Sequence, residues 1–353
     1  MNNPPNLWLG LFSHIDIICR PDVDKLLQLR GLGLDKVGKE YLLESTEMDM
    51  VAKILKAGEE WVGGNAGNAA YFLGNLGIEC NLSMPSRFST LSVLFKDLPV
   101  YVFGIRRKAA VDAARKDAVV AHWIAEVAPP LAKEPDRIIF TPANSHSNWY
   151  DEGFFNHMRS GLLYLSGLHL LENEEEVKKL ADLLEDRRKN LKVYIECGEV
   201  TKMMKFSFET LTRRYLVDAV GMNNNEAQLI GVTSGYPSKL AAQVDDFKED
   251  RGIEATVHAP KWAYSTHKKG LRSAIDLVEA WALDDLSLYK TMDDRPTWPD
   301  QAPATPARKL PEILRKTGLG DVCGILDAMR ILDPTAFEVA IKQASALPLN
   351  RRY

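Results

Sequence analysis

The sequence predicts an α/β protein whose main sheet is parallel and is covered by helices on both faces. Short apolar runs alternate with segments in which apolar residues recur at helical spacing. The runs lie at 162–166, 193–195, 216–220 and 255–258, and the helical segments lie at 174–188 and 271–283. Strands that are separated by helices pair in parallel, and a parallel sheet needs both faces covered.

The N-terminal part adds a strand and a helix. The apolar run Leu7–Phe12 is typical of a buried parallel strand and leads to Asp16. In VGGNAGNAAYFLGNLG the first glycines open a helix, and Gly77 ends it. Residues 21–59 are charged without a clear period, and residues 83–149 have the pattern of short strands and turns. A proline-rich segment at 294–311 is expected to be an ordered surface loop.

Composition excludes several classes of function. The 353 residues are 46% hydrophobic and 26% charged, which is ordinary for a globular protein. A net charge of −4 argues against binding the phosphates of nucleic acid. The most apolar stretch, 162–171, is too short to span a membrane, and no secretory signal is recognisable. Four scattered cysteines predict buried free thiols and a cytoplasmic protein.

A glycine-rich turn, Lys316–Asp321, precedes a predicted buried helix. Apolar residues at i, i+3, i+4 and i+7 define this helix: Val322, Ile325, Leu326 and Met329. The amides at such a helix start favour an anion, and a carboxylate beside that anion can remove a proton from an acceptor. The alternative is a tight turn with an Asp that only caps the helix. No Gly-Lys-Ser/Thr follows, so the turn is not a Walker loop.

Uncharged polar groups and one carboxylate suggest a site for a hydroxylated ligand. Asp16 follows the first strand and could accept hydrogen bonds from hydroxyls, or form a turn. Gly63 and Gly64 leave room for a ligand beside Asn65 and Asn68, or merely open a helix.

Other side chains have both a functional and a plain structural interpretation. Glu196 and Glu226 suit a magnesium ion held through water, or are surface charges. Arg87, Arg106 and Arg107 could hold a phosphate that is already on the acceptor, or are solvated charges. The seven histidines have no spacing typical of a zinc site.

Six motifs carry a resemblance to a known family. TGLGD (317–321), GGNAGNAA (63–70) and GMNNNEAQL (221–229) resemble motifs of the ribokinase-like superfamily. YLSGLHLL (164–171), YIECGEV (194–200) and IEATVHAP (253–260) are similar to motifs of its ADP-dependent branch, the glucokinases and phosphofructokinases. The motifs occur in the expected order over nearly the whole chain. Tyr194 stands where the family has a histidine.

The resemblance implies a three-layer α/β/α sandwich with a smaller β-rich lid. The large domain is expected at 1–20, 60–82 and 150–353, and the lid at 21–59 and 83–149. The implied activity is transfer of a phosphoryl group from ADP to a hydroxyl of a sugar or sugar phosphate, with Mg²⁺. An ATP-dependent sugar or nucleoside kinase and a non-catalytic sugar- or nucleotide-sensing protein are the alternatives. The partners are small molecules, without nucleic acid or membrane; acceptor identity and oligomeric state stay open.

The resemblance also assigns roles residue by residue. Asp321 is the general base, and the anion is held by the amides of Gly318, Leu319 and Gly320. The substrate-binding residues are Asp16, Gly63, Gly64, Asn65 and Asn68. The nucleotide-binding residues are Asn223, Thr317 and His258, and the residues near Mg²⁺ are Glu196 and Glu226, acting through water.

Overall fold

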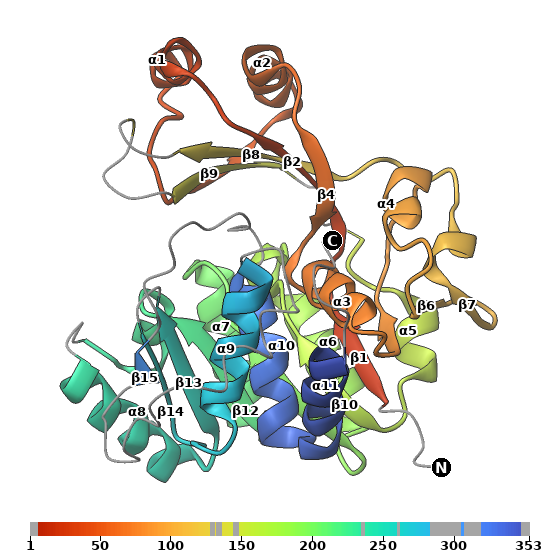
Figure 1. The fold of residues 1–353 in the computed structure, drawn as a ribbon, viewed down its shortest axis with the longest axis vertical. Coiled ribbons are helices and arrows are strands. Elements are labelled where there is room, and N and C mark those ends of the chain that lie inside the picture. Colours follow the sequence, from red (N-terminus) through yellow and green to blue (C-terminus); the bar gives the residue numbers. More distant parts are fainter. Residues whose placement is uncertain are drawn as a thin grey trace.

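The computed structural model describes residues 6–127, 131, 136–143, 148–233, 237–259, 262–282, 305–306 and 319–346. These residues form a ten-stranded sheet and a separate five-stranded sheet. In Figure 1 the smaller sheet lies above the larger one. Among the helices so described, none combines the length and the hydropathy that a membrane-spanning segment needs. The proline-rich segment lies outside the described residues, apart from two of its positions, 305 and 306.

The large sheet is parallel at its centre, as predicted. Its strand order is β15-β14-β13-β12-β11-β10-β1-β5-β6-β7. The parallel strands are β1 (Leu7–Gly10), β5 (Cys80–Leu82), β6 (Val100–Phe103), β10 (Gly161–Leu165), β11 (Leu191–Glu196), β12 (Ala219–Asn223) and β13 (Glu254–Ala259). The antiparallel edge strands are β7 (Arg107–Ala109), β14 (Trp262–Ser265) and β15 (Thr305–Pro306).

Helices cover both faces of this sheet. One face carries α3 (Asn65–Asn75), α9 (Leu271–Ala282), α10 (Leu319–Leu332) and α11 (Pro334–Ala346), and the other carries α5 (Glu152–His157), α6 (Glu174–Glu185), α7 (Lys202–Arg213) and α8 (Pro237–Arg251). Because side chains alternate along a strand, β10 serves both cores: Tyr164 packs in the first, and Leu163 and Leu165 pack in the second. The predicted three-layer sandwich is confirmed.

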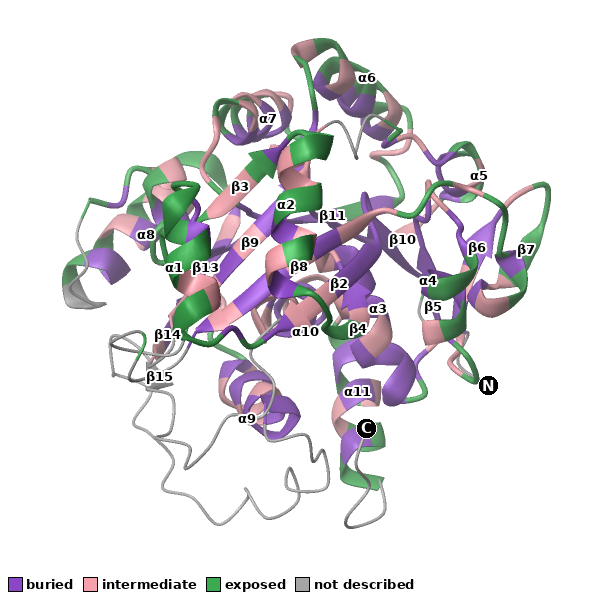
Figure 2. Ribbon diagram, turned by 90° about the horizontal axis from the view of Figure 1, so that it is seen from above, coloured by how far each residue is buried: buried purple, intermediate pink, exposed green. Residues whose placement is uncertain are grey.

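In the part of the chain that the structure describes, the small sheet has helices on one face only. Its order is β3-β9-β8-β2-β4, with β2 (His14–Cys19), β3 (Glu40–Leu43), β4 (Glu59–Gly63), β8 (Ala121–Val127) and β9 (Asp136–Pro142). Helices α1 (Val23–Gly31) and α2 (Ser45–Leu55) pack on its outer face through a core that includes Leu29, Val51 and Phe140. Figure 2 shows these two helices lying across the sheet, with exposed residues on their outer sides. The inner face is therefore available to line a site.

The boundary between the two units differs from the expected one. Residues 14–19 were expected in the large domain, but as β2 they pair with β4 and β8 of the small sheet. Residues 89–109 were expected in the lid, but α4 (Ser89–Leu94), β6 and β7 lie with the large sheet. The reason is packing, since Val100 and Val102 are buried in the same core as Leu82 and α3. The small-sheet unit is accordingly built from residues 14–63 and from the strands of 121–142.

Candidate active site

A cavity of about 620 Å³ lies where the two sheets face each other. Its walls include ten of the residues that the sequence singles out: Asp16, Gly64, Asn65, Asn68, Glu196, Asn223, Glu226, His258, Gly320 and Asp321. Glu196, Asn223 and His258 stand at or near the carboxyl ends of neighbouring parallel strands, where open α/β sheets hold ligands. Thr317 and Gly318 lie outside the described residues, so their roles stay predictions.

Asp321 lies in the first turn of α10 and lines the cavity. The helix begins where the sequence predicts it, and its apolar residues Val322, Ile325 and Met329 are all buried. Asn68 of α3 donates a hydrogen bond from Nδ2 to Asp321 Oδ2 at 2.8 Å. Burial raises the pKa of the Asp321 carboxyl to about 6, while the Asn68 hydrogen bond and the Arg137 charge act in the opposite direction.

Leu319 and Gly320 are the first two residues of α10, so their amides have no acceptor within the helix. Gly320 lines the cavity next to His258, since a Cβ at Gly320 would lie 3.6 Å from Cε1 of that ring. Free amides at a helix start are groups that can bind an anion, and that role stays a prediction for this end of α10.

Gly63 and Gly64 bring the start of α3 against β2. Gly64 caps α3 with φ 75°, a conformation that disfavours other residues. A Cβ at Gly63 would lie 2.3 Å from Asp16 Oδ1, so only glycine leaves space for that carboxylate. Asp16 was expected just after the first strand, at its carboxyl end, or in a turn; it lies instead inside β2, where it is 3% exposed. The difference arises because the chain changes sheets between Gly10 and His14.

Two further buried carboxylates lie on the large-sheet side of the cavity. Glu226 accepts hydrogen bonds from the backbone N and the Nδ2 of Asn223, at 2.8 and 2.6 Å. Glu196 lies 3.4 Å from Nε2 of His258. Burial raises the pKa of Glu226 to about 8 and that of Glu196 well above its usual range, and burial lowers the pKa of His258.

This donor set fits a hard divalent cation. Asp321 adds to the raised pKa of both glutamates, and Glu196 adds to that of Glu226, so the three carboxylates act on one another through a small buried space. Carboxylate oxygens are the ligands that Mg²⁺ prefers, with water completing its coordination. A cation here would relieve the repulsion that raises these pKa values.

Tyr194, which replaces the family histidine, connects β11 to α10. Its hydroxyl donates to Asp327 Oδ2 at 3.0 Å, and Asp327 forms a buried ion pair with Arg330. Arg330 in turn donates to Ser265 Oγ at 2.6 Å. The network anchors the middle of α10, and therefore the helix that carries Asp321, to the sheet.

Sequence reasoning missed the polar residues that the small-sheet unit contributes. The cavity is also lined by His14, Lys39, Glu40, His122 and Arg137. A pattern that could have found one of them, His14, is strand alternation, because His14 and Asp16 share one face of β2. None of Arg87, Arg106 and Arg107 lines the cavity; Arg87 is buried against Asp151 at 2.9 Å, and Arg107 pairs with Glu79.

Three solved structures illustrate the fold that this chain shares with known proteins. A hypothetical ADP-dependent phosphofructokinase from Pyrococcus horikoshii aligns with a TM-score of 0.68 at 15% identity over 97% of both chains. The last common ancestor of ADP-dependent phosphofructokinases from Methanosarcinales aligns with a TM-score of 0.70 at 14% identity, over 99% of this chain and 95% of that one. Adenosine kinase from Sinorhizobium meliloti aligns with a TM-score of 0.60 at 13% identity, over 99% of this chain and 95% of that one. No curated protein matches the chain.

The fold is thus the ribokinase-like three-layer sandwich. The conserved region of the ADP-specific phosphofructokinases and glucokinases matches residues 38–287, and the chain belongs to that family. It is an ADP-dependent sugar kinase, a phosphotransferase with an alcohol group as acceptor. The prediction of ADP as donor is confirmed at this level, and the alternatives of an ATP-dependent kinase and a non-catalytic sensor are not supported.

Proposed function

We propose that Asp321 is the general base of this sugar kinase. The observation that carries the proposal is a partly buried carboxylate at the start of α10, lining the cavity and held by Asn68 at 2.8 Å. A pKa of about 6 leaves the group ionised at neutral pH and still able to accept a proton. In the reaction, the acceptor hydroxyl gives its proton to Asp321 and its oxygen bonds to the β-phosphorus of ADP, while the bond from that phosphorus to the bridging oxygen breaks and AMP leaves.

The acceptor is held at the small-sheet end of the cavity. Asp16 accepts hydrogen bonds from its hydroxyls, and Asn65 and Asn68 offer uncharged amides at the start of α3. Gly63 and Gly64 provide the space next to Asp16 that a larger residue would fill. The small-sheet unit serves as the lid that excludes water, which would otherwise compete with the acceptor hydroxyl.

The donor is held at the large-sheet end. The amides of Leu319 and Gly320, together with Gly318, bind the phosphoryl group that moves, and His258, Asn223 and Thr317 border the nucleotide. Glu196 and Glu226 hold Mg²⁺ through water. When bound, this ion offsets the negative charge of the phosphates.

Replacement Asp321→Asn tests the proposal. We expect kcat to fall by about 10³-fold, the size of a lost general base, with Mg-ADP still raising the melting temperature. Asp49→Asn, which removes the same charge from an exposed position on α2, is the matched control and should keep the wild-type rate. An Asp321→Asn enzyme that keeps most of its kcat would contradict the assignment.

Initial rates with glucose, fructose 6-phosphate, ribose 1-phosphate and a nucleoside, each with Mg-ADP, identify the acceptor. A rate with the sugars but none with the nucleoside is the expected result for this family. Turnover of the nucleoside alone would contradict it.

A further inference from the structure

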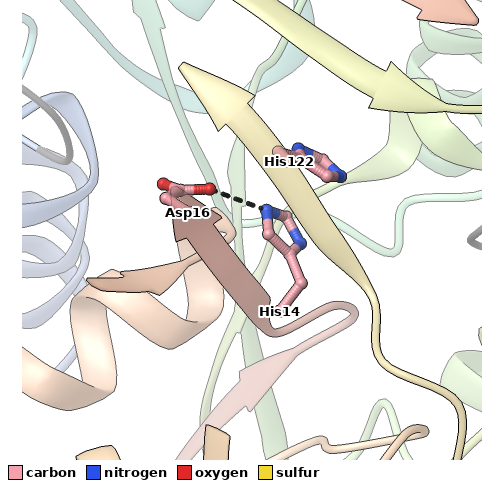
Figure 3. Close-up of side chains that lie close together, drawn as sticks. All are labelled: His14, Asp16 and His122. Carbon is pink, nitrogen blue, oxygen red and sulfur yellow. Dashed lines mark ion pairs between the residues drawn. The ribbon is translucent and has the colours of Figure 1, made fainter. Parts of the chain in front are cut away.

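Three potential metal ligands meet on the inner face of the small sheet. His14 and Asp16 come from β2 and His122 from β8, and one donor atom of each lies within 4.8 Å of the others. Figure 3 shows His14 and Asp16 on one strand and His122 on its neighbour. All three side chains are buried and all three line the cavity. The pairing of β2 with β8 places His122 beside Asp16, so the cluster is fixed by the register of the sheet.

The distances suit a tetrahedral ion. Zinc–ligand bonds of about 2.0–2.1 Å put neighbouring donors of a tetrahedral site about 3.3 Å apart. His14 Nε2 and Asp16 Oδ1 are 3.2 Å apart. The ring of His122 stacks on that of His14 with centroids 3.6 Å apart. Because a metal lies in the plane of the imidazole that binds it, the His122 ring has to turn out of this stack; all three donors lie within 4.8 Å of one another, so the His122 donor moves by about 1.5 Å to reach the spacing of about 3.3 Å.

The surroundings of His122 fix which of its nitrogens is the ligand. Thr141 donates its hydroxyl proton to Glu40 Oε1 at 2.5 Å. The same hydroxyl lies 3.3 Å from Nδ1 of His122, and because its one proton is used it can only accept there. Nδ1 of the neutral ring therefore carries the hydrogen, and the lone pair is on Nε2. Histidines that bind metals are oriented in this way by a partner on the other nitrogen.

We propose that His14, Asp16 and His122 form a binding site for one divalent ion of the zinc class, with its fourth coordination position open to the cavity. Two imidazoles and one carboxylate favour Zn²⁺, Co²⁺ or Ni²⁺ over Mg²⁺, which prefers oxygen ligands. The site is distinct from the carboxylates of the large-sheet side. Asp16 belongs to both this set and the proposed acceptor site, so the ion and the acceptor exclude each other; this consequence rests on the proposed function.

The test is a titration of the metal-free full-length protein with Co²⁺ alone, without Mg²⁺ or nucleotide. We expect a saturable visible absorption band of four-coordinate Co²⁺ at one ion per chain, abolished by one equivalent of Zn²⁺. His14→Asn and His122→Gln should each weaken Co²⁺ binding by at least about 100-fold. Thr141→Val keeps all three ligands but removes the partner of His122, and should weaken binding by about 10–100-fold. His157→Gln, which removes a histidine outside the cavity, should bind as wild type.

A measurement on the unaltered protein guards against variants that fail to fold. X-ray absorption of the wild type with one equivalent of Zn²⁺ should show two imidazole ligands and no sulfur. Co²⁺ binding unchanged in both histidine variants, sulfur ligation, or no saturable band would overturn the site. Loss of turnover in Mg-ADP assays of the metal-free enzyme would instead count against the proposed function, because those assays do not involve this ion.

Discussion

The two walls of the cavity differ in chemistry. The large-sheet wall carries the buried Glu196 and Glu226 and the partly buried Asp321, three carboxyls whose pKa values are all raised. The small-sheet wall carries the buried side chains of His14, Asp16 and His122, and Glu40 also lines it. Crowded carboxylates with raised pKa values suit a cation and a phosphoryl group, whereas carboxylates beside imidazole rings and amides suit a hydroxylated sugar.

Backbone geometry explains why the walls differ. On the large-sheet side, the residues stand at strand ends and at a helix start, where amides and carboxylates converge on one point. On the small-sheet side, the residues stand inside strands, and alternation sends every second side chain to the inner face. The first arrangement binds charge that changes during a reaction, and the second presents a fixed surface for recognition. Substitutions on each wall should therefore affect different kinetic parameters.

The largest effect should come from Asp16 on the small-sheet wall. Asp16→Asn replaces a charged acceptor of hydrogen bonds, each worth about 1.5–3 kcal/mol, so loss of two should lower kcat/KM for the sugar by about 10²–10⁴-fold. The KM for Mg-ADP should stay near the wild-type value. Steady-state kinetics with each substrate varied in turn checks this. An equal rise in the KM of both substrates would show that the walls are not separate.

Glu226→Gln is the corresponding change on the large-sheet wall. It keeps an oxygen for Asn223 but removes the negative charge, so the apparent affinity for Mg²⁺ should fall by about 10–100-fold. Initial rates over a range of Mg²⁺ at saturating ADP and sugar measure it. The KM for the sugar should be the parameter that changes least. A wild-type response to Mg²⁺ would remove Glu226 from the cation site.

Tyr194→Phe tests how the large-sheet wall is anchored. The buried Asp327 loses a donor, and leaving it unsatisfied should lower the free energy of unfolding by about 1–3 kcal/mol. Tyr164→Phe is the matched control, since this tyrosine is stacked on Tyr194 and its buried hydroxyl has no hydrogen-bond partner among the described residues. Urea unfolding of both variants measures the two changes in the free energy of unfolding. Equal effects would mean that the hydroxyl of Tyr194 does not anchor α10.

What the sequence revealed depended on how local the determining contacts are. The start of α10 was predictable because Val322, Ile325 and Met329 show their period within eight residues. The place of Asp16 was not, because one apolar segment continues from β1 into β2 while its partners change from β10 to β4. The place of His122 in the site could not be predicted for the same reason: the register that brings it next to Asp16 joins two strands about a hundred residues apart in the sequence.

The strands at 100–109 illustrate the same limit for domain boundaries. Their short apolar pattern fits either sheet, and only the pairing of β6 with β5 assigns them to the large one. Interactions between distant segments therefore decided the boundary, whereas the start of α10 and the glycine pair of the candidate site could be identified locally.

The smallest effect should be on the pH dependence of kcat/KM, through the hydrogen bond from Asn68 to Asp321. In the wild type, kcat/KM should rise with pH through about 6, because Asp321 must be ionised to accept the proton. Asn68→Ala removes a hydrogen bond that stabilises the ionised carboxylate, so the pKa of Asp321 should rise further. A bond of about 1 kcal/mol corresponds to a shift of about 0.7 pH unit, and activity is lost on the acidic side. Profiles of kcat/KM from pH 5 to 8 measure the shift, and a limb that stays in place or moves to lower pH would show that Asn68 does not act on the base.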